Sequence, residues 1–278
     1  MKIITGNEAL RQCIPNTFAT VEGEVTWFDK LYQYIEQAED WLATNITSPE
    51  IIDMLYQVPE TEPLKRLAAK VITCHALMNA IPSLDLVLTP NGFGIVNTGN
   101  VVPASRDRVE RLIASVELQR DDAINEILGK LAITPSWLES PQGEMFASTL
   151  FPDLSLCRKL AVREHLFDNF LKLQERLITI EATLAETYFS TELMDRFRTS
   201  VISRQAADFI TKGVIRRIQS IELLLLAEKP VSQQTFFDIV DEIKTHPTIF
   251  PEWFLSDTAR LYNQTSFENK KESTGYWF

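Results

Sequence analysis

Residues 84–118 constrain the fold more than any other part of the chain, because they interrupt an otherwise helical pattern. Their sequence, LDLVLTPNGFGIVNTGNVVPASRDRVERLIASVEL, begins with two short apolar stretches separated by Pro90-Asn91-Gly92. Proline suits the first central position of a type I turn, and glycine suits the left-handed position that follows. The segment therefore predicts a β-hairpin over residues 84–96 and a helix that begins after Ser105.

The apolar residues on both sides of this hairpin recur at helical spacing. Residues 24–46 carry an apolar arc that covers about half of a helix circumference, and residues 64–81 are apolar nearly all round, as in a central buried helix. The helix after Ser105 continues the same spacing as far as Leu128. The predicted fold class is therefore mainly α, with two helical halves, the N-terminal one interrupted by the β-hairpin.

Proline and glycine divide the chain into four parts. Residues 134–153 hold three prolines and one glycine, which predicts a linker between domains. The linker separates a helical domain over residues 1–133 from a domain of two long helices over residues 154–246, with the helices at 154–189 and 193–228. Residues 247–278 are predicted to be an aromatic-rich C-terminal tail that docks on its own body or on a partner.

The composition limits the classes of function. The formal net charge of −11 disfavours a protein that wraps around nucleic acid, because such binding depends on an excess of cations. The longest aliphatic run is too short to span a bilayer, and the first residues lack the apolar segment of a secretory signal. We expect a cytoplasmic protein that does not bind membranes.

No catalytic or metal-binding pattern is present in the sequence. The three cysteines, Cys13, Cys74 and Cys157, form no CxxC pair. The chain also lacks a phosphate-binding glycine motif and a nucleophile motif. We therefore expect no enzyme activity, no cofactor and no metal site.

The three histidines are widely separated and show no metal-ligand spacing. His75 lies on the apolar helix and is expected to be a hydrogen-bonded core residue, with a ligand or general base as the alternative. His165 is expected at the surface or in a groove of a long helix. His246, which precedes Pro247, is expected at a helix end, where it can satisfy the last carbonyls.

Three arginines occupy the first two turns of the helix after Ser105, where the helix dipole disfavours cations. They either pair with an acidic surface of a neighbouring subunit or lie there incidentally. The hairpin tip, these arginines and the last three aromatic residues are the elements that we expect to reach a partner. The predicted partner interface comprises Pro90, Asn91, Gly92, Phe93, Arg106, Arg108, Arg111, Tyr276, Trp277 and Phe278.

The hairpin segment also carries a resemblance. The sequences TPNGFGIV at 89–96, NVVPAS at 100–105 and RVERL at 108–112 resemble a family of uncharacterised proteins from Bacteroidetes genomes, prophages and phages. Its members resemble the head–tail adaptor, connector or head-completion proteins of phages. Unlike a minimal adaptor, this chain carries a second helical half.

The resemblance implies a structural virion protein without catalytic residues, located in the host cytoplasm or in the virion. The implied partners are portal, tail or stopper proteins, and other copies of the chain in a ring, with DNA only as passing cargo. A first alternative is a ligand-binding or regulatory module with a groove between the two long C-terminal helices. A second alternative is an enzyme whose acidic or histidine catalysts come from distant residues.

Overall fold

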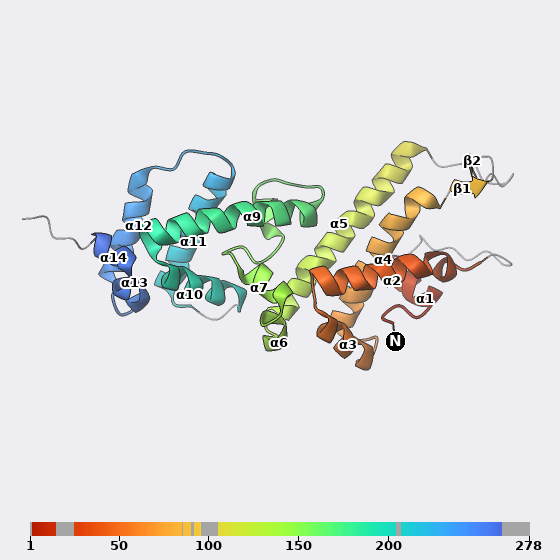
Figure 1. Cartoon of the computed structure of the whole chain (residues 1–278), viewed down its shortest axis with the longest axis horizontal. Helices are drawn as coiled ribbons and strands as arrows, with labels where there is room; N and C mark the ends of the chain where they lie inside the picture. The colour runs from red at the N-terminus through yellow and green to blue at the C-terminus, as the bar shows by residue number, and fades with distance from the viewer. Residues whose placement is uncertain are drawn as a thin grey trace, which may run out of the picture. The chain divides into compact units, whose positions relative to one another are not determined.

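The computed structural model describes residues 2–14, 25–84, 86–89, 92–95, 105–203 and 207–262 (Figure 1). Within these residues the chain forms fourteen α-helices. It divides into two compact units, which we describe separately. Unit 1 comprises residues 1–174 with 202–204, and unit 2 comprises residues 175–201 with 205–278.

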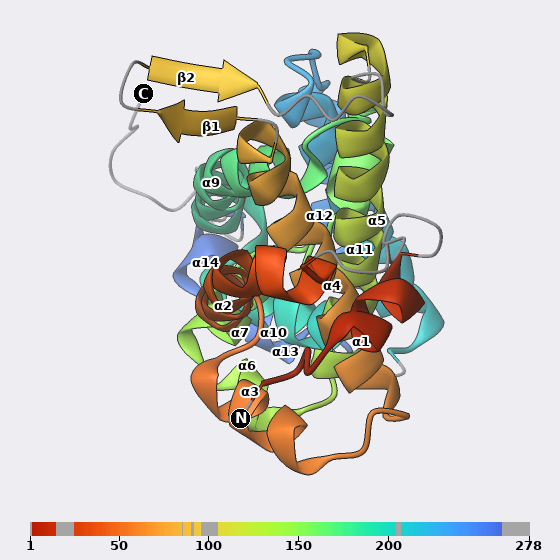
Figure 2. The same cartoon turned by 90° about the vertical axis from the view of Figure 1, so that its right-hand side faces the viewer.

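Unit 1 is built around three helices. These are α2 (Trp27–Asn45), α4 (Pro63–Ala80) and α5 (Arg106–Leu131), and α4 packs against both of the others. Figures 1 and 2 show α4 and α5 side by side. The short helices α1 (Asn7–Cys13) and α3 (Pro49–Gln57) complete this part of the unit, and a 3-10 turn, Ile81–Ser83, follows α4.

The apolar face of each long helix forms the core of unit 1. On α4 the buried residues lie on several sides of the helix, among them Ala68, Val71, Ile72 and Leu77. This confirms the prediction that residues 64–81 form a central buried helix, since a helix with neighbours on two sides must be apolar over most of its circumference. Helix α2 instead buries a single stripe that includes Leu31, Ile35 and Leu42.

The predicted fold class must be corrected, because the architecture contains no β layer. Extended backbone pairs antiparallel only between β1 (Leu86–Thr89) and β2 (Gly92–Ile95), with Leu86 opposite Ile95. Among the described residues no third strand joins this pair. Two four-residue strands are too small a sheet to form a stable layer on their own. The fold class is therefore mainly α. The short strand pair does not divide the N-terminal half into separate parts.

The predicted linker over residues 134–153 is wrong. Its prolines begin helices α6 (Pro135–Leu138) and α7 (Pro141–Ala147), because proline fits the first helical turn, where no amide donor is needed. Trp137 is buried and donates its indole N–H to the carbonyl of Ile46 at 2.9 Å. Phe146 stacks on Phe170 with ring centroids 5.6 Å apart. Residues 134–153 therefore belong to the core of unit 1.

The two long C-terminal helices are each divided. The first is α8 (Ser155–Lys159), α9 (Leu166–Leu184) and a π-helical turn (Ala185–Phe189), and the second is α10 (Thr191–Ile202) and α11 (Phe209–Leu226). Left-handed backbone at Ala161 and His165, with φ of 60° and 49°, marks the break between α8 and α9. Neither residue is a glycine, so the sequence gives no signal for this interruption. Ser190, with a φ of 66°, lies between the two predicted long helices.

Unit 2 continues with α12 (Gln233–Thr245), α13 (Pro251–Leu255) and α14 (Asp257–Tyr262). In the first part of the predicted tail over 247–278, Phe250 and Trp253 are fully buried, so this part packs on its own unit, which is one of the two alternatives that the sequence left open. The indole of Trp253 donates to the carbonyl of Tyr188 at 2.8 Å. Pro251 begins a helix instead of ending structure. Residues 263–278 lie outside the described residues.

Unit 2 also buries two carboxylates. Glu181 of α9 and Glu222 of α11 have no exposed surface, and Arg198 of α10 donates to Glu181 at 2.7 Å. Neither carboxylate oxygen of Glu222 has a hydrogen-bond partner among the described residues. Burial, together with the negative charge of Glu181, raises the pKa of Glu222 well above its usual range, and Arg198 only partly opposes this. Glu222 is therefore protonated in the folded protein over a pH range in which the unfolded chain ionises it.

Among the described residues, no helix combines the length and the apolar character that crossing a bilayer requires.

We predict that Gly143→Ala destabilises the protein by roughly 2 kcal/mol, within the range for overpacked cores. A Cβ at this position would lie 1.9 Å from the Trp137 carbonyl oxygen, and backbone cannot yield as a side chain can. The matched control is Gly213→Ala in α11, where nothing lies within 4 Å of the new Cβ. We expect the control to gain about 0.5–1 kcal/mol from helix propensity. Urea unfolding of both variants measures the difference, and equal effects would contradict the steric argument.

We predict that Glu222→Gln stabilises unit 2 at neutral pH, because the variant folds without having to take up a proton at this position. In the wild type the folded state holds a proton that the unfolded state releases. Stability therefore falls as pH rises from the usual glutamate range towards the folded pKa. The gain of the variant should shrink as pH falls to the usual glutamate range. Glu175→Gln, on the exposed part of α9, is the control and should show no such pH-dependent gain. A variant less stable than the wild type at neutral pH would refute the protonation argument.

Candidate functional site

The three predicted interface arginines lie at the start of α5 and are exposed. Arg106 donates to the Glu110 carboxylate at 2.5 Å, one helical turn further on. Arg111 donates to the carbonyl of Asp107 at 3.2 Å. Two of the three arginines therefore have partners on their own helix, and pairing with a neighbouring subunit stays a prediction.

The other predicted interface residues are only partly placed. Gly92 and Phe93 belong to β2, of which only the backbone pairing is described. The remaining members lie outside the described residues; they are Pro90, Asn91, Tyr276, Trp277 and Phe278. The structure therefore does not bring the hairpin tip, the arginines and the chain end together into one site.

The first ten residues of α5, residues 106–115, extend beyond the core of unit 1, and we call them the α5 arm. Every residue of the arm is exposed or half-exposed, and burial begins only at Val116. Leu112 is 39 % exposed, although it lies one turn before Val116 on the same side of the helix. Within the described residues, the helix face that the rest of α5 buries is therefore only partly covered on the arm, where Val109 and Ile113 are of intermediate burial.

Directly after the arm, α5 carries a buried charged cluster. Glu117, Arg120 and Asp121 are 7 %, 5 % and 1 % exposed. The Arg120 guanidinium donates through Nε to Asp121 at 2.8 Å and lies 3.5 Å from Glu117. It also lies over the ring of Trp41, with 5.7 Å between the guanidinium carbon and the ring centroid. Arg120 thus compensates two buried carboxylates and packs on an aromatic face of α2.

Asp121 links this cluster to the start of α9. Its second carboxylate oxygen accepts the backbone N–H of Leu166 at 3.0 Å and that of Phe167 at 3.4 Å. These are amides of a first helical turn, which have no partner within the helix. Burial raises the pKa of Asp121, and the positive charge of Arg120 opposes that rise. The carboxylate therefore acts as a capping group supplied by another helix.

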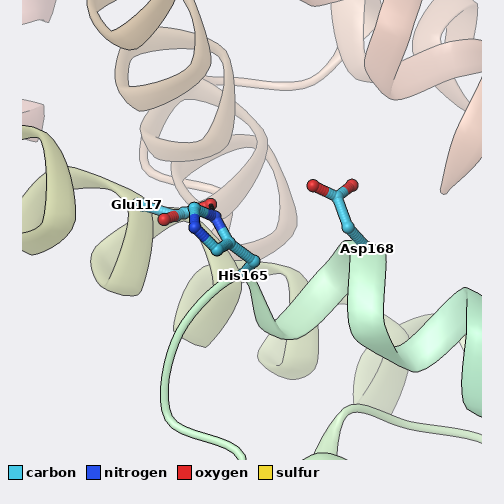
Figure 3. Close-up of side chains that lie close together, drawn as sticks. All are labelled: Glu117, His165 and Asp168. Carbon is cyan, nitrogen blue, oxygen red and sulfur yellow. Dashed lines mark hydrogen bonds and ion pairs between the residues drawn. The ribbon is translucent and has the colours of Figure 1, made fainter.

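His165 closes the cluster at its exposed side. Its Nδ1 lies 2.8 Å from Glu117 Oε1, and its backbone is left-handed with a φ of 49°. Figure 3 shows its ring beside Glu117, with Asp168 projecting separately from the first turn of α9. The hydrogen bond to Glu117 raises the pKa of His165. The imidazolium form is therefore favoured, and the stabilisation that this pair contributes is lost as pH rises through the raised pKa.

His75, on α4, has a different environment. Its ring stacks on Trp41 with centroids 4.2 Å apart, and its Nδ1 is buried without a hydrogen-bond partner among the described residues. Burial, with the positive charge of Arg120, lowers the pKa of His75 to about 4. The prediction that His75 is a hydrogen-bonded core residue is therefore wrong in one respect, because Nδ1 has no hydrogen-bond partner among the described residues. The ring is held by stacking on Trp41. His246 lies at the C-terminal end of α12, as predicted, with Nδ1 2.9 Å from the carbonyl oxygen of Glu242.

Glu117, His165 and Asp168 are a possible ligand set for a divalent cation. One ligand atom from each lies within 4.8 Å of the others. Two effects oppose a cation here. Arg120 already supplies a positive charge beside Glu117, and His165 must lose its proton before it can bind a metal. The geometry therefore favours a structural role over a metal centre: the ion pair between His165 and Glu117 holds the start of α9 on α5.

The sequence analysis missed this cluster, although the sequence holds a signal for it. Residues 117, 120, 121, 124 and 128 share one helix face, and the last two are the buried Ile124 and Leu128. Charged residues on the face that a helix buries indicate a buried ion pair. The partner His165 could not be identified in this way, because its position depends on the break between α8 and α9.

Comparison with known proteins gives one similarity. Residues 23–147 match a family described as a family of unknown function (DUF6712). The matched segment contains α2 to α7 and therefore the arm and the α5 side of the charged cluster. No curated protein and no solved structure matches the chain.

The sequence-based prediction that the protein has no metal site stays a prediction, and this cluster is where it can be tested. We expect isothermal titration of the dialysed protein with Zn²⁺ or Mn²⁺ near neutral pH to show no stoichiometric binding, because Arg120 competes for Glu117. The control is His165→Ala, which removes the nitrogen ligand. One ion bound per chain in the wild type and none in this variant would overturn the prediction.

Proposed function

We propose that the chain is a structural assembly protein of the head–tail connector type, which works by binding other copies of itself and neighbouring virion proteins. The observation that supports the proposal best is the α5 arm. Within the described residues the arm covers its apolar face only in part, with Leu112 39 % exposed and Val109 and Ile113 of intermediate burial. A partly exposed apolar helix face can dock in a groove of a partner.

The apolar residues of the arm form a stripe along one face of the helix, and this stripe is the proposed contact surface. Val109, Leu112, Ile113 and Val116 follow the spacing i, i+3, i+4 and i+7, which places them on one face. Val116 is fully buried in unit 1, whereas Leu112 is 39 % exposed. The same stripe thus packs against the core of its own subunit at one end. At its other end, within the described residues, it is only partly covered, which leaves Leu112 accessible to a second subunit.

Charge complementarity favours a second copy of the chain as the occupant. Arg106 and Arg108 lie exposed at the tip of the arm, and the chain as a whole carries a net charge of −11. With Asp107 and Glu110 beside the three arginines, the arm keeps a net charge of plus one, and this positive charge is attracted to the acidic surface of a neighbouring copy. A contact between different surfaces of successive copies is heterologous, and it closes into a ring when the rotation permits. This agrees with the connector resemblance of residues 84–118.

We predict that Leu112→Asp abolishes self-association of the full chain, as measured by sedimentation velocity over a range of protein concentrations. A charge at the centre of the apolar stripe must be buried without a partner when the arm docks. The control is Leu118→Asp on the same helix, which is 46 % exposed and lies outside the stripe. Far-UV circular dichroism should be unchanged in both variants. A wild-type protein that stays monomeric at every concentration, or equal loss in both variants, would count against the proposal.

Gold-labelled antibodies against the chain test the connector assignment itself. In particles purified from a host that carries the gene, we expect label at the neck between head and tail. Label absent from particles but present in the host cytoplasm would refute a virion role, even if the chain forms rings in isolation.

A further inference from the structure

Unit 1 contains a hollow of about 640 Å³ that belongs neither to the arm nor to the charged cluster. Its walls come from α1, from the first turns of α4 and from the second half of α5. This volume lies within the range of about 300–1,000 Å³ that is typical of small-molecule sites. The size of the hollow therefore suits a small organic ligand.

The charged groups in the hollow are mainly cations. Lys65, Arg66, Lys70 and Lys130 line it, against two carboxylates, Glu60 and Glu126, which leaves a local charge of plus two in a chain with a net charge of −11. Because the whole chain is acidic, an average patch of its surface would carry a negative charge. The hollow is thus a positive site on a negative protein, which favours an anionic ligand.

Three of these cations form no ion pair within the part of the chain that the structure describes. Among the described residues, no ion pair joins Arg66, Lys70 or Lys130 to a carboxylate, although many other arginines of the chain are paired. Arg66 and Lys70 are one turn apart on α4, a spacing at which like charges destabilise a helix. Both lie close enough to Cys13 to oppose the rise that burial causes in its pKa. An anion held between them would relieve this repulsion.

The fourth cation, Lys65, is held in place by a hydrogen bond to the backbone. Lys65 is 9 % exposed, and its ammonium donates to the carbonyl of Val58 at 2.8 Å. A buried ammonium that makes one hydrogen bond still has two donors to offer. The rest of the wall includes apolar side chains such as Ile3, Pro63 and Leu67. The site therefore combines a cationic rim with apolar surface.

We propose that this hollow binds a small organic phosphate monoester, with the phosphate between Arg66 and Lys70 and the organic group against Ile3 and Leu67. A phosphate monoester carries a charge of about −1.5 to −2 near neutral pH, which matches the local charge of plus two. The guanidinium fork of Arg66 suits phosphate oxygens, and the ammonium of Lys70 adds a point charge. This site is independent of the proposed assembly function.

Isothermal titration of the full chain with phenyl phosphate tests the proposal, with inorganic phosphate and benzoate as comparison ligands. We expect phenyl phosphate to bind more tightly than either, because only it offers both a dianion and an apolar group. The double variant Arg66→Ala/Lys70→Ala should weaken binding on the order of tenfold or more, since charge-assisted hydrogen bonds are lost. The matched control is Arg163→Ala/Lys172→Ala, which removes the same charge from exposed positions of unit 1.

A second readout locates the ligand. Cys13 lines the hollow and is partly exposed, whereas Cys74 and Cys157 are buried. Phenyl phosphate should therefore slow alkylation of Cys13 by iodoacetamide, measured by mass spectrometry of the Cys13 peptide. Three results would overturn the proposal: no binding of phenyl phosphate, equal weakening in the control variant, or inorganic phosphate or benzoate binding as tightly. Binding that leaves alkylation of Cys13 unchanged would also overturn it.

Discussion

The buried carboxylate of Asp121 is the interaction on which the architecture of unit 1 depends. It is 1 % exposed, it pairs with Arg120 of the same helix, and it accepts the first backbone amides of α9. Desolvating a carboxylate costs several kcal/mol per ion, so the group is tolerated only where hydrogen bonds and an opposite charge surround it. The positions of α5 and of the start of α9 are thereby tied to each other, because neither can move without exposing an unpaired charge.

This constraint extends from α5 to the two helices beside it. Arg120 packs on Trp41 of α2, and Trp41 stacks on His75 of α4, so one guanidinium connects the three long helices of the unit. The second half of α5 is held on several sides as a result. A projecting helix of ten residues would be only marginally stable alone, because helix nucleation is costly. Continuity with the fixed half of α5 is what allows the arm to remain helical while its apolar stripe is only partly covered within the described residues.

Periodicity in the sequence predicted the helices whose environment is simple. The central α4 follows directly from where its apolar residues lie, whereas α2 buries a single stripe and not the whole of the wide apolar arc in its sequence. The errors came from residues with two possible roles. Pro135, Pro141 and Pro251 begin helices, although the same residue type also ends them. The break between α8 and α9 has no local signal, because neither Ala161 nor His165, which adopt left-handed backbone there, is a glycine. Candidate sites were missed for a related reason: the cations on α4 were visible, but their convergence with α1 and α5 was not.

The arm and the hollow use opposite ends of the same helix pair. The hollow lies where the first turns of α4 meet the second half of α5, and the arm is the other end of α5. Since α4 packs along α5, both features depend on one interface, which lies within the residues that match the DUF6712 family. The wall that Ile3 and helix α1 supply, including Cys13, lies outside that match. The arm therefore needs only the matched segment, whereas the hollow is complete only in chains that also carry the segment before it. The two proposals can accordingly fail independently, because a chain can possess the first feature without the second.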